Sequence, residues 1–268
     1  IYGAICWSNE QITFLKEKGV TFVSDSAESF GNFGVAMAAR AELIDFQVFS
    51  FYGNKTVTCG EGGMIMSSRN NGRALKSLRS HSQLTPGEYR HGQVAFNYRL
   101  NNISAAIGAK QISLLDEILS RKRMLFSFYD QLVESHLRSH VYKQSFDPRS
   151  NALNNIQWLY TLALSSDNSP NEVIDYSDIS QYFLKHGIEV RPGFVPLSKQ
   201  EYIFRKSPQF ATAAGFHSPG TSVTYIPCSW QLRAISLPSY PDLNEDSASL
   251  LSIKKAFEGL GKSAGLSL

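Results

Sequence analysis

The sequence predicts an α/β fold built on a mostly parallel sheet. Short β-branched or aromatic runs alternate with stretches of helical periodicity in the first half of the chain. This alternation is typical of parallel strands joined by helices. The chain has 268 residues, of which 43% are hydrophobic and 18% charged, so it can bury a sizeable core. Its length suits one large domain, or one and a half.

Three runs in this half are predicted to be strands: residues 20–25, 45–53 and 62–68. The first is short, β-branched and typical of a buried strand. Residues 11–19 predict the end of an amphipathic helix closed by Gly19, and residues 70–81 predict a second helix. Residues 102–137 keep helical spacing over a long span, which predicts one or two long helices between a large and a small domain.

The pattern changes after about residue 140. We expect a large domain over residues 1–120 and a smaller α+β domain over residues 121–268. The later part predicts, in order, a strand, a helix–glycine turn–strand unit, a loop-rich stretch and a terminal helix over residues 156–164, 177–192, 199–230 and 243–261.

Composition excludes several classes of protein. The net charge is +3 and the basic residues are scattered, which argues against a nucleic-acid partner. Three cysteines without a CxxC pair argue against a disulfide framework and a structural zinc site, and they favour the cytoplasm. No apolar run is long enough to span a membrane. The opening IYGAICW resembles the interior of a folded domain, so we expect a fragment of a longer protein.

A candidate site centres on Lys55, within SFYGNKTVTCGEGGMIM. Glycines at four nearby positions let the backbone approach a ligand. Ser50 and Asp25 fall at the ends of predicted strands, where parallel sheets bind ligands. A lysine for a Schiff base, an acid for a pyridinium nitrogen and a hydroxyl for a phosphate are what pyridoxal phosphate requires. The alternatives are a solvated loop lysine and a helix N-cap at Asp25.

Five segments in consistent order resemble one family: VSDSAESFG, FSFYGNKTVTCGEGGMI, SLRSHS, FNYRLNNISAAIGAKQ and IEVRPGFVPL. They resemble the DegT/DnrJ/EryC1/StrS family of pyridoxal-phosphate-dependent sugar-nucleotide aminotransferases, in particular the perosamine synthases. The resemblance implies the type I fold of these transferases, a mostly parallel large domain with a smaller α+β domain. It also implies that the N-terminal part of the large domain is missing here.

The resemblance assigns roles by position. Lys55 matches the Schiff-base lysine, which also carries protons, and Asp25 matches the catalytic acid on the pyridine nitrogen. Glu28 matches the position beside the cofactor's phenolic oxygen, and Ser50 matches a phosphate ligand. Asn97 matches an asparagine that reaches the cofactor of the neighbouring subunit, which implies a homodimer with a shared active site.

Arg191 falls where the family has an arginine near the sugar nucleotide, so it is the candidate substrate ligand. No metal site is expected. Glu28 could instead belong to a solvated helix face, and Asn97 could be only a helix N-cap. Ser198 and Ala95 stand where relatives often have histidine and glycine, which puts substrate contacts in doubt.

The function implied is transfer of an amino group from glutamate to a keto carbon of a nucleoside-diphosphate 4-keto-6-deoxy sugar, for cell-surface polysaccharide or glycoside synthesis. A sugar dehydratase is disfavoured, because those relatives place histidine where Lys55 stands. The remaining alternative is a truncated, non-catalytic relative that binds a partner or a sugar nucleotide. The chain lacks GxxxxGK[ST], and lacks GxGxxG after a strand, so phosphate-loop and dinucleotide sites have little support.

Overall fold

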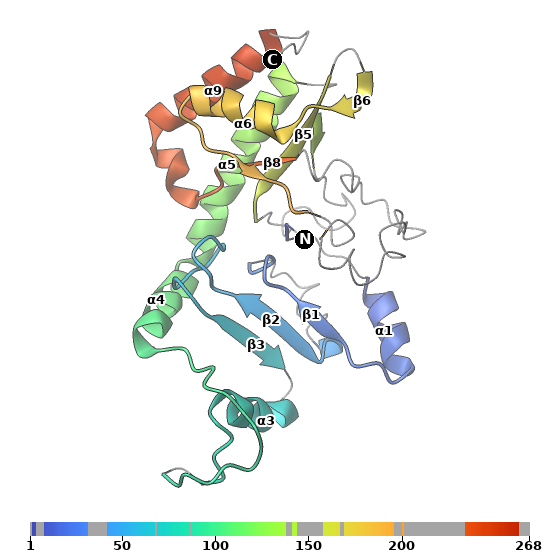
Figure 1. Cartoon of the computed structure of the whole chain (residues 1–268), viewed down its shortest axis with the longest axis vertical. Helices are drawn as coiled ribbons and strands as arrows, with labels where there is room; N and C mark the ends of the chain where they lie inside the picture. Colours follow the sequence, from blue (N-terminus) through green and yellow to red (C-terminus); the bar gives the residue numbers. More distant parts are fainter. Residues whose placement is uncertain are drawn as a thin grey trace. The chain divides into compact units, whose positions relative to one another are not determined.

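A computed structural model of the chain divides into two compact units, which are considered separately below (Figure 1). The first unit comprises residues 1–119 and 154–158, and the second comprises residues 120–153 and 159–268. The structure describes residues 2–3, 8–31, 42–67, 69–85, 87–137, 141–143, 158–166, 169–195, 200 and 234–262.

The first unit contains a sheet in the order β1-β2-β3, formed by Val23–Asp25, Phe46–Ser50 and Gly63–Ser67. Strands β1 and β2 are parallel, with Asp25 opposite Val48. Strand β3 is antiparallel to β2, whereas the sequence predicted a mostly parallel sheet. The loop over residues 51–62 contains no helix that could carry the chain back for a parallel pairing, so it returns as a hairpin.

Strand β1 also differs from its prediction as a buried strand. It is only three residues long, and the side chain of Val23 is 60% exposed. Within the described part of the chain, β1 is at the edge of the sheet with only β2 beside it. A β-branched run does not reveal how many neighbouring strands cover it, which is why its burial was overestimated.

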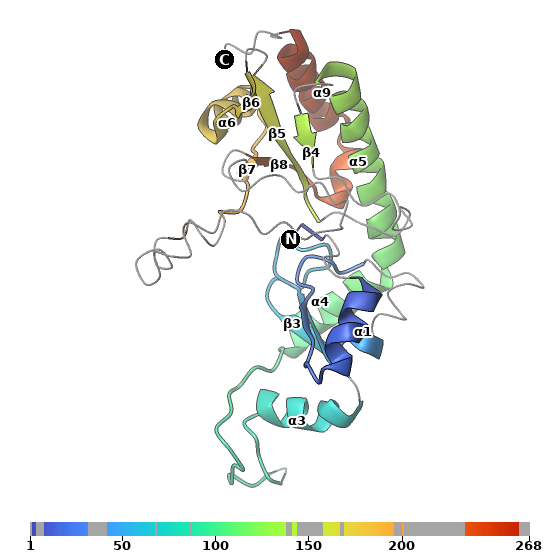
Figure 2. The same ribbon diagram turned by 90° about the vertical axis from the view of Figure 1, so that its right-hand side faces the viewer.

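Helices of the first unit follow the predicted boundaries closely. Helix α1 (Asn9–Glu17) begins at a capping box between Ser8 and Gln11 and is followed by Gly19 in a left-handed conformation. Helix α3 (Arg69–Arg79) lies beyond the end of β3 in both views (Figures 1 and 2). Helix α4 (Asn102–Ser113) begins at Asn101, whose side chain accepts a hydrogen bond from the Ser104 N–H.

The second unit contains an antiparallel sheet in the order β4-β5-β8-β7, with β6 also paired to β5. These strands are Val141–Lys143, Tyr160–Ser166, Ile235–Leu237, Arg191–Pro192 and, for β6, Ser169–Val173. The sequence predicted β5 and β7 but missed the other three, of which β4 and β8 are too short for an alternating pattern to register.

Among the residues that the structure describes, three α-helices and a 3-10 helix accompany this sheet: α5 (Leu115–His136), α6 (Tyr176–Lys185), η4 (Pro241–Glu245) and α9 (Ser247–Lys262). The predicted span 102–137 is thus two helices, α4 and α5. Buried side chains of α5, β5, α6, β8 and α9 form one apolar core. Rings from α6 and α9, those of Phe183 and Phe257, meet edge to face in it. Apart from residue 200, the stretch 199–230 predicted to be loop-rich lies outside the described residues.

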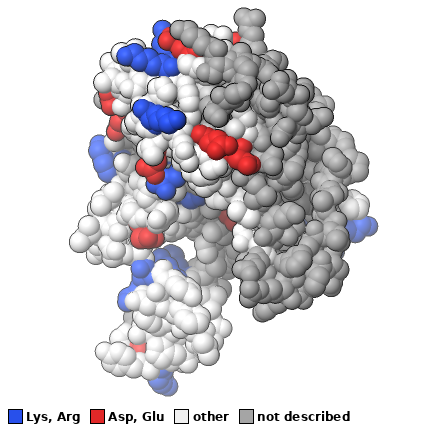
Figure 3. All heavy atoms as spheres, turned by 45° about the horizontal axis from the view of Figure 1, so that its top comes forward, with Lys and Arg blue, Asp and Glu red and all other residues white. Residues whose placement is uncertain are grey.

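The described helices include none that is long and apolar enough to cross a membrane. Among the same residues, no group of three or more His, Cys, Asp and Glu side chains is placed to hold a metal ion. On the face drawn in Figure 3, the basic side chains of described residues lie among acidic ones rather than in one basic area.

Candidate active site

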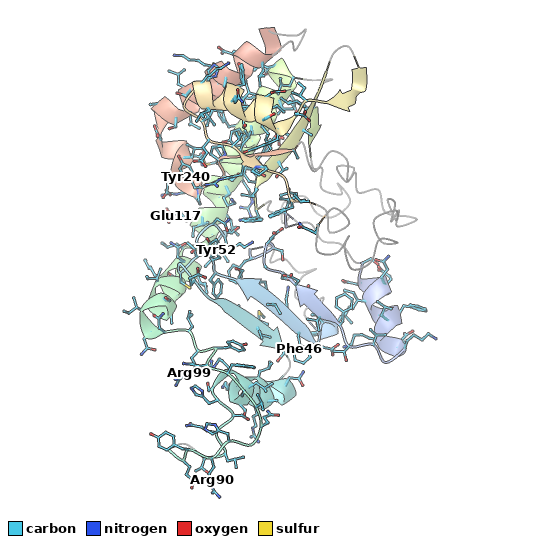
Figure 4. All side chains as sticks on the ribbon, in the orientation of Figure 1. Phe46, Tyr52, Arg90, Arg99, Glu117 and Tyr240 are labelled. Carbon is cyan, nitrogen blue, oxygen red and sulfur yellow. The ribbon has the colours of Figure 1, made fainter. Side chains whose placement is uncertain are left out.

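The loop between β2 and β3 positions Lys55. Figure 4 shows Phe46 and Tyr52 at opposite ends of β2, and the loop starts at the Tyr52 end. The Phe51 N–H donates to the Gly62 carbonyl at 2.9 Å, which closes the loop. Inside it, the Lys55 N–H donates to the Tyr52 carbonyl at 2.9 Å, and the Val57 side chain is fully buried. These contacts restrain the backbone of Lys55.

Two glycines at the end of this loop, Gly62 and Gly63, lie close against other atoms of the protein. Gly62 has a φ of +135°, and a Cβ atom there would lie 2.7 Å from Leu100 Cδ1. A Cβ atom at Gly63 would lie 2.7 Å from the Phe49 carbonyl oxygen on the adjacent strand. The sequence interpretation explained the nearby glycines by ligand access; at these two positions, close approach of the protein's own atoms is sufficient explanation.

The amine of Lys55 lies between a carboxylate and an aromatic face. Its Nζ atom is 3.8 Å from Glu28 Oε1 and 3.6 Å from the centroid of the Trp158 ring. Only 12% of the Lys55 side chain is exposed. Burial lowers the pKa of Lys55 below its ordinary value, although the charges of Glu28 and Asp25 act in the opposite direction. A larger fraction of this lysine is therefore neutral near pH 7 than for a solvated lysine, contrary to the alternative of a solvated loop residue.

Asp25 ends β1, beside the same loop. Its Oδ1 atom accepts a hydrogen bond from the Ala27 N–H at 3.1 Å, the local turn that aspartate favours. Residues 26–31 form turns rather than a helix, so the alternative of a helix N-cap is wrong. The negative charge of Asp25 acts on Lys55, so the structure brings these two predicted residues together.

Glu28 lies on this turn. The alternative that Glu28 belongs to a solvated helix face is therefore wrong. The second oxygen of Glu28, Oε2, accepts the backbone N–H of Tyr2 at 2.5 Å. Ser50 is the last residue of β2, and its Oγ atom accepts from the Tyr52 N–H at 3.3 Å. Ser50 therefore lies at the strand end from which the Lys55 loop departs.

Asn97 lies in the extended segment between α3 and α4. Its Oδ1 atom accepts a hydrogen bond from Arg99 Nε at 2.9 Å, and its side chain is exposed. The N-cap of the following helix is Asn101, so the alternative that Asn97 is that cap is wrong. Figure 4 shows Arg90 near the tip of this segment and Arg99 on its return toward α4.

Arg191 belongs to β7 of the second unit, where the Glu189 carboxylate pairs with it at 3.0 Å. Three-quarters of the Arg191 side chain is exposed. The described contacts therefore join Asp25, Glu28 and Lys55, whereas Arg191 has a separate local partner.

Two residues at the site were missed from the sequence: Trp158 and Tyr2. Trp158 is buried, and its Nε1–H donates to the Asn54 carbonyl, 104 positions earlier in the chain, at 2.7 Å. The sequence placed this tryptophan in a predicted strand, where nothing distinguishes it from a core residue. No periodic signal encodes a contact over such a separation.

The residues at this end of the sheet fit pyridoxal phosphate. A largely covered lysine of lowered pKa, two carboxylates beside it and a strand-end serine are a suitable donor set for an aldehyde, a ring nitrogen and a phosphate. The set lies where β1 and β2 end, the usual ligand-binding edge of α/β sheets.

Comparison with known proteins then decides the family. The model of the DegT/DnrJ/EryC1/StrS aminotransferase family matches residues 1–251. The chain belongs to this family. The structure is similar to Helicobacter pylori PseC, an aminotransferase of pseudaminic acid biosynthesis, with a TM-score of 0.74 at 18% identity over 98% of this chain and 65% of PseC. It is also similar to 3-amino-5-hydroxybenzoic acid synthase, with a TM-score of 0.70 at 16% identity over 98% of this chain and 66% of that protein. The predicted α/β fold of these transferases is confirmed.

Two curated relatives are similar in sequence. EpsN of Bacillus subtilis, whose name describes a pyridoxal phosphate-dependent aminotransferase, is 30% identical over 92% of this chain and 58% of EpsN. GDP-perosamine synthase of Vibrio cholerae is 29% identical over 92% of this chain and 61% of that enzyme. The chain thus spans about three-fifths of these relatives' length.

Proposed function

We propose that the protein is a pyridoxal-phosphate-dependent aminotransferase that transfers an amino group from glutamate to the keto carbon of a nucleoside-diphosphate 4-keto-6-deoxy sugar. The observation that carries this proposal is the Lys55 amine, which lies against Glu28 beside the ends of β1 and β2. The names of relatives supply the sugar class, since GDP-perosamine synthases and a UDP-linked amino-sugar transaminase are among them.

Lys55 would bind the cofactor and then move the proton between cofactor and substrate carbons. The lowered pKa of Lys55 favours both tasks, because a neutral amine is the nucleophile and the base. Asp25 would pair with the ring nitrogen, Glu28 would lie near the phenolic oxygen, and Ser50 would bind the phosphate. The cofactor, when bound, supplies an electron sink for the carbon that carries the amino group.

The proposal includes a homodimer in which Asn97 serves the partner's site and Arg191 contacts the sugar nucleotide. Exposure of Asn97 is compatible with a contact to a second copy. Near Asn97 in the chain, seven large apolar side chains of described residues are exposed: Tyr89, Val94, Phe96, Tyr98, Leu100, Ile103 and Ile107. So many exposed apolar residues near one another in the chain favour an interface. A role in polysaccharide synthesis and a cytoplasmic location complete the proposal.

The test is amino transfer by the complete gene product. Glutamate and pyridoxal phosphate would be supplied with GDP-, UDP- or dTDP-linked 4-keto-6-deoxy sugars, and products would be identified by mass spectrometry. We expect equimolar amino sugar and 2-oxoglutarate with one nucleotide, and none with Lys55→Met. Failure to form 2-oxoglutarate with every substrate would contradict the proposal and favour a non-catalytic relative.

A further inference from the structure

Trp158 covers the amine of Lys55 with the face of its ring. Its ring centroid is 3.6 Å from Lys55 Nζ, a short distance for a cation over an aromatic face. Trp158 itself is only 4% exposed. Its Nε1–H donates to the carbonyl of Asn54, the residue just before the lysine, at 2.7 Å. The ring therefore contacts the amine, and its N–H fixes the adjacent backbone.

A closed set of contacts links this tryptophan to the carboxylate beside the lysine. The Trp158 backbone N–H donates to the Tyr2 carbonyl at 3.2 Å, and the Tyr2 N–H donates to Glu28 Oε2. The other oxygen of Glu28 faces the Lys55 amine. Tyr2 thus joins the two groups that flank the amine, although they are 130 positions apart in the chain, and fixes both with its own backbone.

The indole has an electrostatic effect that an aliphatic cover would lack. Any apolar side chain here would remove water from the ammonium and disfavour its charge. The negative face of an indole, the best of the aromatic rings for this purpose, partly offsets that cost by attracting the cation. The charged groups that act on Lys55 among the described residues are Glu28 and Asp25, so the indole adds to two carboxylates.

We propose that Trp158 is a positioning residue for Lys55: its indole face holds the ammonium against Glu28, and its N–H fixes the loop at Asn54. The importance of this for catalysis rests on the proposed function, in which Lys55 binds the cofactor. The contact itself is measurable without the cofactor. A tryptophan that only fills space would be replaceable by leucine without effect on the lysine's titration.

The test measures the pKa of Lys55 in the complete gene product freed of cofactor. Trace labelling with acetic anhydride modifies only neutral amines, and peptide mass spectrometry reports Lys55 at each pH from about 7 to about 11, a range that spans the ordinary lysine value. Trp158→Leu keeps the apolar cover but removes the aromatic face. We expect its Lys55 pKa to fall by about 0.5 to 1.5, and that of Trp158→Phe to fall by less.

Two further variants calibrate this result. Glu28→Gln keeps an acceptor for the Tyr2 N–H but removes the charge, so the Lys55 pKa is also expected to fall. Phe14→Leu is the matched control, because Phe14 has the exposed Lys18 ammonium 5.6 Å from its centroid and lies on α1, away from the Lys55 loop in sequence. It should leave Lys55 unchanged. An unchanged or raised Lys55 pKa in Trp158→Leu would overturn the proposal.

A second measurement applies if Trp158→Leu does not fold. With Trp7 and Trp230 replaced by phenylalanine, the emission of Trp158 is expected to shift with pH at the midpoint found for Lys55, and to stay constant when Lys55→Met is added. Emission insensitive to the Lys55 charge would overturn the proposal. Cofactor attachment to another lysine would instead overturn the proposed function alone, since neither titration needs the cofactor.

Discussion

At the scale of a residue, buried Lys122 of the second unit is expected to make the stability of the protein depend on pH. Lys122 is 2% exposed, and its Nζ donates to the Ser239 carbonyl at 2.7 Å and lies 5.1 Å from the Phe126 ring centroid. Burial lowers the pKa of Lys122 to about 7. The unfolded chain, with an ordinary lysine, binds this proton more tightly than the folded chain does. The Lys122 contribution to stability therefore rises with pH between about 7 and about 10.5.

Lys122→Met removes this titration. Between pH 7.5 and 9.5, we expect the free energy of unfolding of the wild type to rise relative to the variant by about 2–3 kcal/mol. Denaturant unfolding of both proteins at the two pH values measures this difference. Exposed Lys254 on α9 supplies the control, and its Met variant should run parallel to the wild type. Parallel curves for Lys122→Met would show that Lys122 does not titrate in this range.

At the scale of elements, the close pairing of β3 with β2 requires a glycine at position 63. A Cβ atom at Gly63 would lie 2.7 Å from the Phe49 carbonyl oxygen, whose strand cannot move without disturbing the sheet. We expect Gly63→Ala to destabilise the protein by about 1–3 kcal/mol and to weaken cofactor binding, because the Lys55 loop ends here. Thermal unfolding and cofactor titration measure the two effects.

Gly72→Ala is the matched control for this substitution. Gly72 lies inside α3, and a Cβ atom there would meet nothing within 4 Å. Alanine at that position should be neutral or stabilise the helix by up to about 1 kcal/mol. Equal effects of the two substitutions would contradict the close approach at Gly63.

The sequence predicted elements best where their signals are local. The end of α1 just before Gly19, the approximate bounds of α3 and the helical span that holds α4 and α5 follow from glycine punctuation and helical spacing. Strand direction is different, because an apolar run such as Gly63–Ser67 is the same whether it pairs parallel or antiparallel. The predicted burial of β1 was wrong for a similar reason, since burial depends on neighbours in space.

For the candidate site too, the sequence predicted the residues with local signals and missed those that depend on distant contacts. Lys55 and Asp25 were expected from the local sequence, and Glu28 from the family resemblance; the structure brings the three together. Trp158 was not, because its contacts with Asn54 and Lys55 join stretches about a hundred positions apart. Such pairs become visible only when the fold is known.

At the scale of the whole molecule, the proposed dimer predicts different effects of two exposed apolar residues. Ile103 of α4 lies close in sequence to Asn97, and Leu184 of α6 lies in the second unit; both are more than half exposed. We expect Ile103→Glu to convert a dimer to a monomer, since a charge in an interface core is unfavourable, and Leu184→Glu to leave it intact. Light scattering gives the mass. A monomeric wild type, or dissociation by Leu184→Glu alone, would contradict this interface.

The proposed function depends first of all on the binding of pyridoxal phosphate by Lys55. The most direct measurement incubates the complete gene product with pyridoxal phosphate, records the visible absorbance, reduces with borohydride and maps the modified peptide. We expect a yellow protein, bleached by glutamate, with the reduced cofactor on Lys55. A colourless protein, or a label on another lysine, would contradict this expectation.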